Sequence, residues 1–123
     1  MFTDISNTEL RKFLSKLRID HGQSLIKMSE KIGYSASYLS LIERGERTIP
    51  KGFVQKIAEI YKLDDTQSVT LIKAISKSTS EIVIDMKSLN AEQKELTVLF
   101  SEKIYNLEPN LIKKIKKLLK EVE

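Results

Sequence analysis

The chain contains no cysteine and no tryptophan, and its 123 residues include only two prolines, four glycines and one histidine. The absence of cysteine excludes disulfides and thiolate metal sites. No apolar run approaches the roughly 20 residues of a membrane-spanning helix. The opening "MFTDISNTEL" has acidic residues and lacks the apolar core of a signal peptide. These absences predict a cytoplasmic protein that makes no use of a membrane.

The residue types that carry catalysis are also sparse. The single histidine, His21, falls at the end of the first predicted helix, where histidine commonly has a structural role. The sequence has no acidic cluster at metal-ligand spacing, no nucleophile elbow and no phosphate-binding loop. We therefore expect no enzymatic activity, no metal and no cofactor.

The composition is that of a folded protein with a mild basic excess. Hydrophobic residues make up 41% and charged residues 31% of the chain, which is typical of globular domains. The length suits one domain, or a compact domain with a short second piece. A net charge of +4 permits nucleic-acid or other anionic partners without requiring them. Whole-chain charge is thus a weak guide, and local patterns have to identify the partner.

Three short helices are predicted in the first half, and a glycine follows each of them. In residues 7–21 one apolar stripe recurs at helical spacing: Leu10, Phe13, Leu14 and Leu17. Ser24 and Ser35 can cap the next two helices, whose inward residues are Met28, Ile32, Leu39 and Ile42. The glycines are Gly22, Gly33 and Gly45, and glycine tolerates the left-handed conformation just past a helix end. Only Gly33 and Tyr34 connect the second helix to the third, which predicts a helix-turn-helix.

The stretch "LRIDHGQSLIKMSEKIGYSASYLSLIERGERTIP" resembles the DNA-binding core of the Cro/CI-type (XRE) helix-turn-helix regulators, the group of the lambda-like phage repressors. The likeness covers about residues 7–63. It places small Ser29 where the second and third helices touch, Gly33 in the turn, and "IERG" at the close of the motif. It also implies an ion pair between Arg18 on the first helix and Glu43 at the end of the third.

The resemblance implies which side chains meet DNA. Base-edge readout falls to Ala36, Ser37 and Leu41, phosphate contact to Ser35, and flanking contacts to Tyr38 and Ser40. Small and apolar side chains allow close approach and favour thymine methyl groups, while none on this helix forms a bidentate pair with a base. We therefore expect part of the specificity to come from DNA shape, operator spacing or the segment "RGERTIPK".

Further phosphate contacts are expected around this helix. Many family members carry Gln where this chain has Leu25, so Ser24 or Lys27 would have to supply that contact. Three cations also follow the third helix within eight residues, Arg44, Arg47 and Lys51, and each phosphate they neutralise adds about 0.9 to the salt dependence of binding.

Two more helices complete the first predicted domain, residues 1–77. Residues 50–63 have Phe53, Val54, Ile57, Ile60 and Tyr61 facing inward or nearly so. The next helix begins at Asp64 or Asp65. Its predicted inward residues are Val69, Leu71, Ile72 and Ile75. The fold class is thus all-α, a five-helix lambda-repressor-like DNA-binding domain followed by a short extended segment and a C-terminal helical hairpin.

The region 78–123 is predicted to dimerise. After a polar hinge, Ile82, Ile84 and Met86 alternate with other residues, which indicates a strand. A lone strand needs a partner, so we expect it to pair with a second subunit; the alternative is an irregular linker. Two amphipathic helices follow, and their apolar stripes include Leu96, Leu99, Phe100, Ile104, Ile112, Ile115 and Leu119. Five lysines lie opposite the last stripe and are interpreted as a solvated face, with membrane-surface or DNA contact as alternatives.

The function expected from the sequence is a sequence-specific double-stranded DNA-binding regulator. It would act as a homodimer on a palindromic operator, as a repressor from a phage or mobile element. An antitoxin or inhibitor is the alternative, in which the C-terminal region binds another protein and DNA binding is autoregulatory. A third reading is that DNA binding has been lost.

Overall fold

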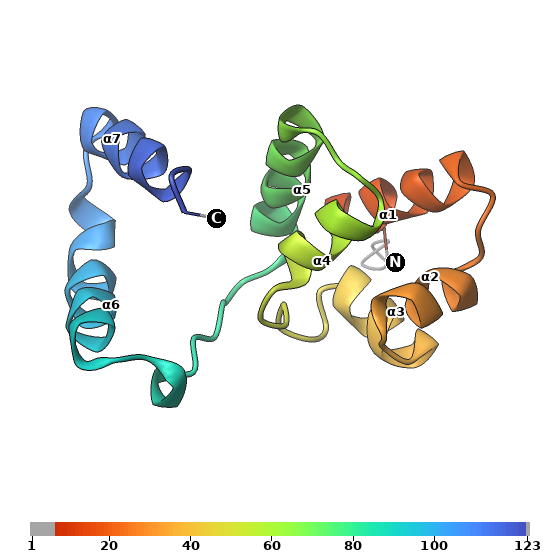
Figure 1. Cartoon of the computed structure of the whole chain (residues 1–123), viewed down its shortest axis with the longest axis horizontal. Coiled ribbons are helices and arrows are strands. Elements are labelled where there is room, and N and C mark those ends of the chain that lie inside the picture. The colour runs from red at the N-terminus through yellow and green to blue at the C-terminus, as the bar shows by residue number, and fades with distance from the viewer. Residues whose placement is uncertain (1–6, 123) are drawn as a thin grey trace, which may run out of the picture. The chain divides into compact units, whose positions relative to one another are not determined.

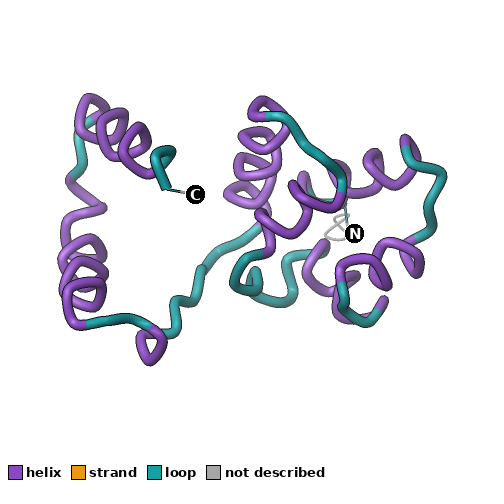
Figure 2. Tube along the Cα trace, viewed as in Figure 1, coloured by secondary structure: helices purple, strands orange, loops and turns teal. Residues whose placement is uncertain are grey.

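A computed structural model of the protein describes residues 7–122, so the first six residues of the opening considered for a signal peptide lie outside the described part. Within this part the chain is all-helical and has no strand, which confirms the all-α prediction (Figures 1 and 2). No helix there is long and apolar enough to cross a membrane. The helices are α1 (Glu9–Asp20), α2 (Leu25–Ile32), α3 (Ala36–Glu43), α4 (Phe53–Ile60), α5 (Asp65–Ser78), α6 (Ala91–Lys103) and α7 (Pro109–Leu119), with 3-10 turns at Met86–Ser88 and Ile104–Asn106.

By its internal contacts the chain divides into two units, which meet at Ile84 and Asp85. The domain boundary predicted after residue 77 lies at the end of α5, seven residues before Ile84. Four of the five helices of the first unit begin at polar caps: the side chains of Thr8, Ser24, Ser35 and Asp64 accept backbone N–H groups at the starts of α1, α2, α3 and α5. These caps fix where those four helices begin.

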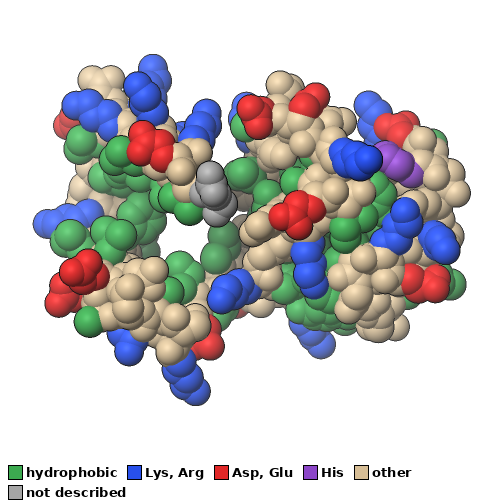
Figure 3. Space-filling model, in the orientation of Figure 1, with side chains coloured by type: hydrophobic (Ala, Val, Ile, Leu, Met, Phe, Trp, Pro, Cys, Tyr) green, Lys and Arg blue, Asp and Glu red, His purple; other side chains and the backbone are tan. Residues whose placement is uncertain are grey.

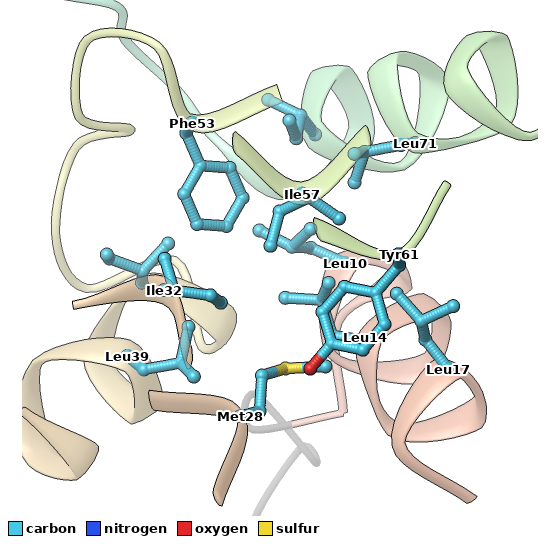
Figure 4. Packing of buried hydrophobic residues seen from close by; sticks show 12 residues of the cluster. Leu10, Leu14, Leu17, Met28, Ile32, Leu39, Phe53, Ile57, Tyr61 and Leu71 are labelled. Carbon is cyan, nitrogen blue, oxygen red and sulfur yellow. The ribbon is translucent and has the colours of Figure 1, made fainter. Parts of the chain in front are cut away.

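The first unit encloses one hydrophobic core, to which all five helices contribute (Figure 4). Its buried members are Leu10, Leu14, Leu17, Met28, Ile32, Leu39, Ile42, Phe53, Ile57, Tyr61, Leu71 and Ile75. The core residues predicted on the first four helices are among them or pack against them, but the prediction for α5 was partly wrong. Val69 and Ile72 are 39% and 53% exposed, because α5 turns Leu71, Ala74 and Ile75 toward its neighbours.

The ends of three helices meet where the chain leaves the first unit. The backbone N–H of Leu10 donates to the Ser78 hydroxyl at 3.0 Å, and the Thr8 hydroxyl donates to the backbone carbonyl of Glu43. Gly45, just past α3, adopts a φ of +76°, and a Cβ built there would lie 2.6 Å from the Ser78 carbonyl oxygen. Glycine is therefore required at position 45 both by its backbone angle and by its contact with the end of α5.

Gly45→Ala should destabilise the protein by about 2 kcal/mol, because left-handed strain of about 1–2 kcal/mol is joined by a clash with a backbone carbonyl. Gly22→Ala is the matched control, since Gly22 also has positive φ but nothing lies within 4 Å of its added Cβ. Urea denaturation of both variants measures the difference. Equal losses of stability would contradict the Ser78 contact.

The region after α5 differs from its prediction in two ways. Residues 79–85 form no helix and no strand, and Met86 lies in a 3-10 turn in which the Asp85 carboxylate accepts the Lys87 N–H at 3.0 Å. The predicted strand is therefore not present in the described single chain, which offers it no partner for a ladder. α6 starts with the predicted capping box of Asn90 and Gln93, but α6 and α7 do not pack along each other as a hairpin would (Figure 1).

No side chain of α6 or α7 is buried. The exposed apolar residues of this unit include Leu96, Leu99, Phe100, Ile104, Ile112 and Leu119. Figure 3 shows hydrophobic side chains at the surface of the molecule. Ile115 and Met86 are half-buried, whereas Ile82 and Ile84, at the end of the first unit, are exposed. Isolated helices of this length are marginally stable in water, so we expect the apolar faces of α6 and α7 to pack against another protein surface.

Candidate nucleic-acid interface

The connection from α2 to α3 has the geometry of a tight helix-helix turn. Gly33 has a φ of +90°, and the N–H groups of Gly33 and Tyr34 both donate to the Ser29 carbonyl, at 2.9 and 3.0 Å. Ser29 itself is buried, and its hydroxyl donates to the Ile26 carbonyl at 2.7 Å. A small, internally satisfied side chain at position 29 lets the two helices cross closely.

α3 divides into a buried face and an open face. Leu39, Ile42 and Glu43 are buried, whereas Ser37 is exposed and the other side chains of α3 are half-buried. A shallow open hollow in front of the open face is lined by Leu25, Ala36, Ser37, Ser40, Leu41 and Arg44. Five of the predicted DNA-contacting residues are thus brought together on one surface, and Leu25 joins them as a lining residue that the predicted contact set omitted.

The serine caps stand at the two helix starts beside this hollow. The Ser24 hydroxyl accepts the Lys27 N–H and the Ser35 hydroxyl accepts the Tyr38 N–H, both at 3.1 Å. Each hydroxyl retains a proton that it can donate to an outside acceptor. Both caps and Lys27 are exposed, and unpaired N–H groups at helix starts favour anions.

Two of the three cations that follow α3, Arg44 and Arg47, interact with Glu46. Arg44 Nε lies 3.0 Å from Glu46 Oε2, and Arg47 donates to the Glu46 backbone carbonyl at 3.1 Å. Lys51 is exposed just before α4. Because Glu46 neutralises Arg44 in part, Arg47 and Lys51 carry more of the local positive charge.

The predicted pair of Arg18 and Glu43 is present and ties α1 to the end of α3. It is bidentate: Arg18 Nη1 lies 3.1 Å from Glu43 Oε2, and Nη2 lies 3.0 Å from Oε1. The side chains are only 11% and 2% exposed. Burial raises the pKa of the Glu43 carboxyl, and the hydrogen bonds and charge of Arg18 offset part of that rise. The pair therefore fixes the orientation of α3 from its buried side.

An aromatic cluster that no sequence pattern indicated lies beside the turn. Tyr34 packs edge-on against Tyr38 of α3 with ring centroids 5.3 Å apart, and it stacks on Phe53 of α4 at 6.5 Å. Lys56 Nζ lies 4.7 Å from the Tyr34 ring centroid. Phe53 and Lys56 are distant from Tyr34 in sequence, so only the fold reveals that they meet it.

The described residues contain no group of three or more His, Cys, Asp or Glu side chains that could hold a metal ion. His21 caps the end of α1, with its Nδ1 3.0 Å from the Leu17 carbonyl oxygen and its ring edge-on to Tyr61. The contacts of His21 are thus those of a structural residue.

Comparison with known protein families gives a match over the first unit. The family model of the "Helix-turn-helix domain" matches residues 9–71, just over half of the chain, from the start of α1 into α5. No curated protein and no solved structure matched the chain.

Proposed function

The chain belongs to the helix-turn-helix domain family, and on that premise we propose that it is a non-enzymatic repressor of the Cro/CI type that binds a palindromic operator as a homodimer. α3 would lie in the major groove of double-stranded DNA. The observation that carries this proposal is the open face of α3, where small side chains border a shallow hollow between two capped helix starts. Long side chains would hold a duplex away from this surface.

The roles along this face follow from side-chain chemistry. Ala36 and Leu41 have only apolar groups to offer a base edge, so they suit thymine methyls, while the Ser37 hydroxyl can donate or accept. The sugar-phosphate backbone would be contacted by Ser24, Lys27, Ser35, Tyr38, Ser40, Arg44, Arg47 and Lys51. Direct discrimination between bases is then modest, and DNA shape supplies part of the specificity.

A homodimer is supported by the second unit. Its apolar stripes on α6 and α7 are exposed in the single chain. α7 carries four lysines and Lys120 follows it, whereas residues 85–108 carry five acidic and three basic side chains. Apolar stripes with flanks of opposite charge favour α7 of one copy packing against α6 of a second copy, with residues 82–86 beside the same interface.

The test is a titration of purified protein on its own upstream DNA and on a scrambled duplex, by fluorescence anisotropy at two salt concentrations. Light scattering on the same sample gives the mass. Preference for the upstream duplex together with a dimer mass is the expected result. Equal, salt-sensitive binding to both duplexes would contradict specific operator binding there, and a monomer mass would contradict the dimer.

Lys51→Gln should lower the salt slope of log Kd by about 0.9 for each bound protomer, because one phosphate contact is lost. Lys73→Gln is the matched control, since Lys73 is exposed on α5 and its substitution removes the same charge. Anisotropy titrations across a salt series measure both slopes. Equal slopes for the two variants would remove Lys51 from the contact set.

A second candidate function rests on the same exposed stripes. They would suit another protein as well as a second copy, as in an antitoxin or inhibitor with autoregulatory DNA binding. A monomer mass, together with a second small polypeptide that copurifies at equal stoichiometry, favours this candidate. A symmetric dimer with no second polypeptide counts against it.

A further inference from the structure

The turn between α2 and α3 is bridged by one side chain from α4. Lys56 Nζ donates to the carbonyl of Ile32, the last residue of α2, at 3.3 Å, and it also lies over the Tyr34 ring. Gly33, with positive φ and no side chain, is the only residue between them. A single ammonium group therefore holds both sides of the turn that sets how α2 and α3 cross. A cation is also favourable beside carbonyls at a helix C-terminus.

The contact continues into the candidate recognition helix. Tyr34 packs with its ring plane at 85° to that of Tyr38, in the first turn of α3, and its ring plane lies only 7° from that of Phe53. Edge-to-face, stacked and cation-π arrangements are each favourable geometries for aromatic rings. Lys56, Tyr34 and Tyr38 thus form a continuous chain of contacts from α4 to α3.

On the open side of α3, the first residue of α2 makes no hydrogen bond that could restrain α3. Leu25, the first residue of α2, lines the hollow, and its aliphatic side chain can neither donate nor accept a hydrogen bond. Neither Tyr34 nor Lys56 lines that hollow. The restraints on α3 therefore come from its other sides: the Arg18 and Glu43 pair at its end, and the Lys56 contacts at its start.

We infer that Lys56 is a positioning residue for DNA binding, which acts through Tyr34 on α3 and does not itself touch DNA. This inference rests on the proposed function. It makes a distinctive prediction, because removing a phosphate contact lowers the salt slope of binding, whereas loosening the recognition helix lowers affinity and leaves the slope unchanged.

The experiment compares Lys56→Met, Lys56→Arg and the control Lys73→Met on the duplex that the wild-type protein prefers. Lys56→Met keeps the aliphatic stem and should bind about 5-fold more weakly with an unchanged salt slope. Lys56→Arg keeps a cation above the ring and should bind within about 2-fold of wild type. Lys73→Met should match wild type in both affinity and slope.

A second measurement does not depend on DNA. Amide hydrogen exchange of residues 36–40 in the free protein should be faster in Lys56→Met than in Lys73→Met, because the start of α3 opens more often. A salt slope lowered by about 0.9, unchanged affinity and exchange, or an equal loss in Lys56→Arg would each overturn the positioning role. If wild-type protein prefers no duplex, the proposed function fails while the exchange comparison still tests the contacts of Lys56.

Discussion

Ser37→Glu should weaken binding to the preferred duplex by at least about 100-fold, the equivalent of about 3 kcal/mol. Ser37 is exposed on the open face of α3, where a carboxylate would oppose the bases and phosphates of the major groove. The fold itself should be unaffected, because an acidic residue in the first turn of a helix is favourable. Anisotropy measures the affinity, and thermal unfolding should show a Tm equal to or slightly above that of wild type.

Ser76→Glu is the matched control for this result. Ser76 is an exposed serine on α5 that does not line the open face of α3, so the variant has the same added charge outside that face. It should bind within a few fold of wild type, since exposed charges beyond a Debye length are largely screened. Equal affinities for the two variants would remove the assignment of α3 as the recognition helix, and with it the proposal that the open face reads DNA.

Arg18→Met should destabilise the protein by about 3 kcal/mol, because it leaves the buried Glu43 carboxylate without its bidentate partner. Met fills much of the volume of the Arg stem, so the loss is chiefly electrostatic. The double variant Arg18→Met, Glu43→Leu should recover most of the stability, since replacing both members of a buried pair by apolar residues is often neutral. Urea denaturation measures all three proteins.

The exposed pair of Lys12 and Glu9 supplies the control. Its atoms lie 3.7 Å apart and both side chains are about half exposed, so Lys12→Met should stay within about 0.5 kcal/mol of wild type. A loss in Arg18→Met no larger than that in Lys12→Met would show that solvent, not burial, governs the pair. A double variant as unstable as Arg18→Met would mean that lost packing dominates.

The helices of the first unit could be predicted from sequence because their signals are local. Ser24 and Ser35 cap helices where the pattern placed them, and glycine follows α2 and α3 with positive φ. The Arg18 and Glu43 pair came from the family resemblance, since nothing local links residues 25 positions apart. Likewise, only the family resemblance shows that Leu25 stands where many members have Gln.

Other features depend on how distant elements meet. Period-two alternation around Ile82 indicated a strand, but a strand requires a partner strand, and residues 7–122 contain none. Val69 and Ile72 were predicted to be buried because their spacing fits a stripe, yet α5 is packed on a different face. The contacts of Lys56 could not be predicted, because it is 24 residues from Ile32 and because a lysine on the exposed face of a helix is ordinarily solvated.

The anchoring of Ser78 limits how far apart the first units of two copies could lie in a dimer. Ser78 is anchored to α1 and lies against Gly45 just past α3, so the linker to the second unit starts beside the end of α3. Residues 79–84 form the linker between α5 and the second unit, and six fully extended residues span about 20 Å. If two copies join through their second units as proposed, the two linkers together span at most about 40 Å, so half-sites moved apart by much more than one further turn of DNA, about 34 Å, would lie beyond their reach.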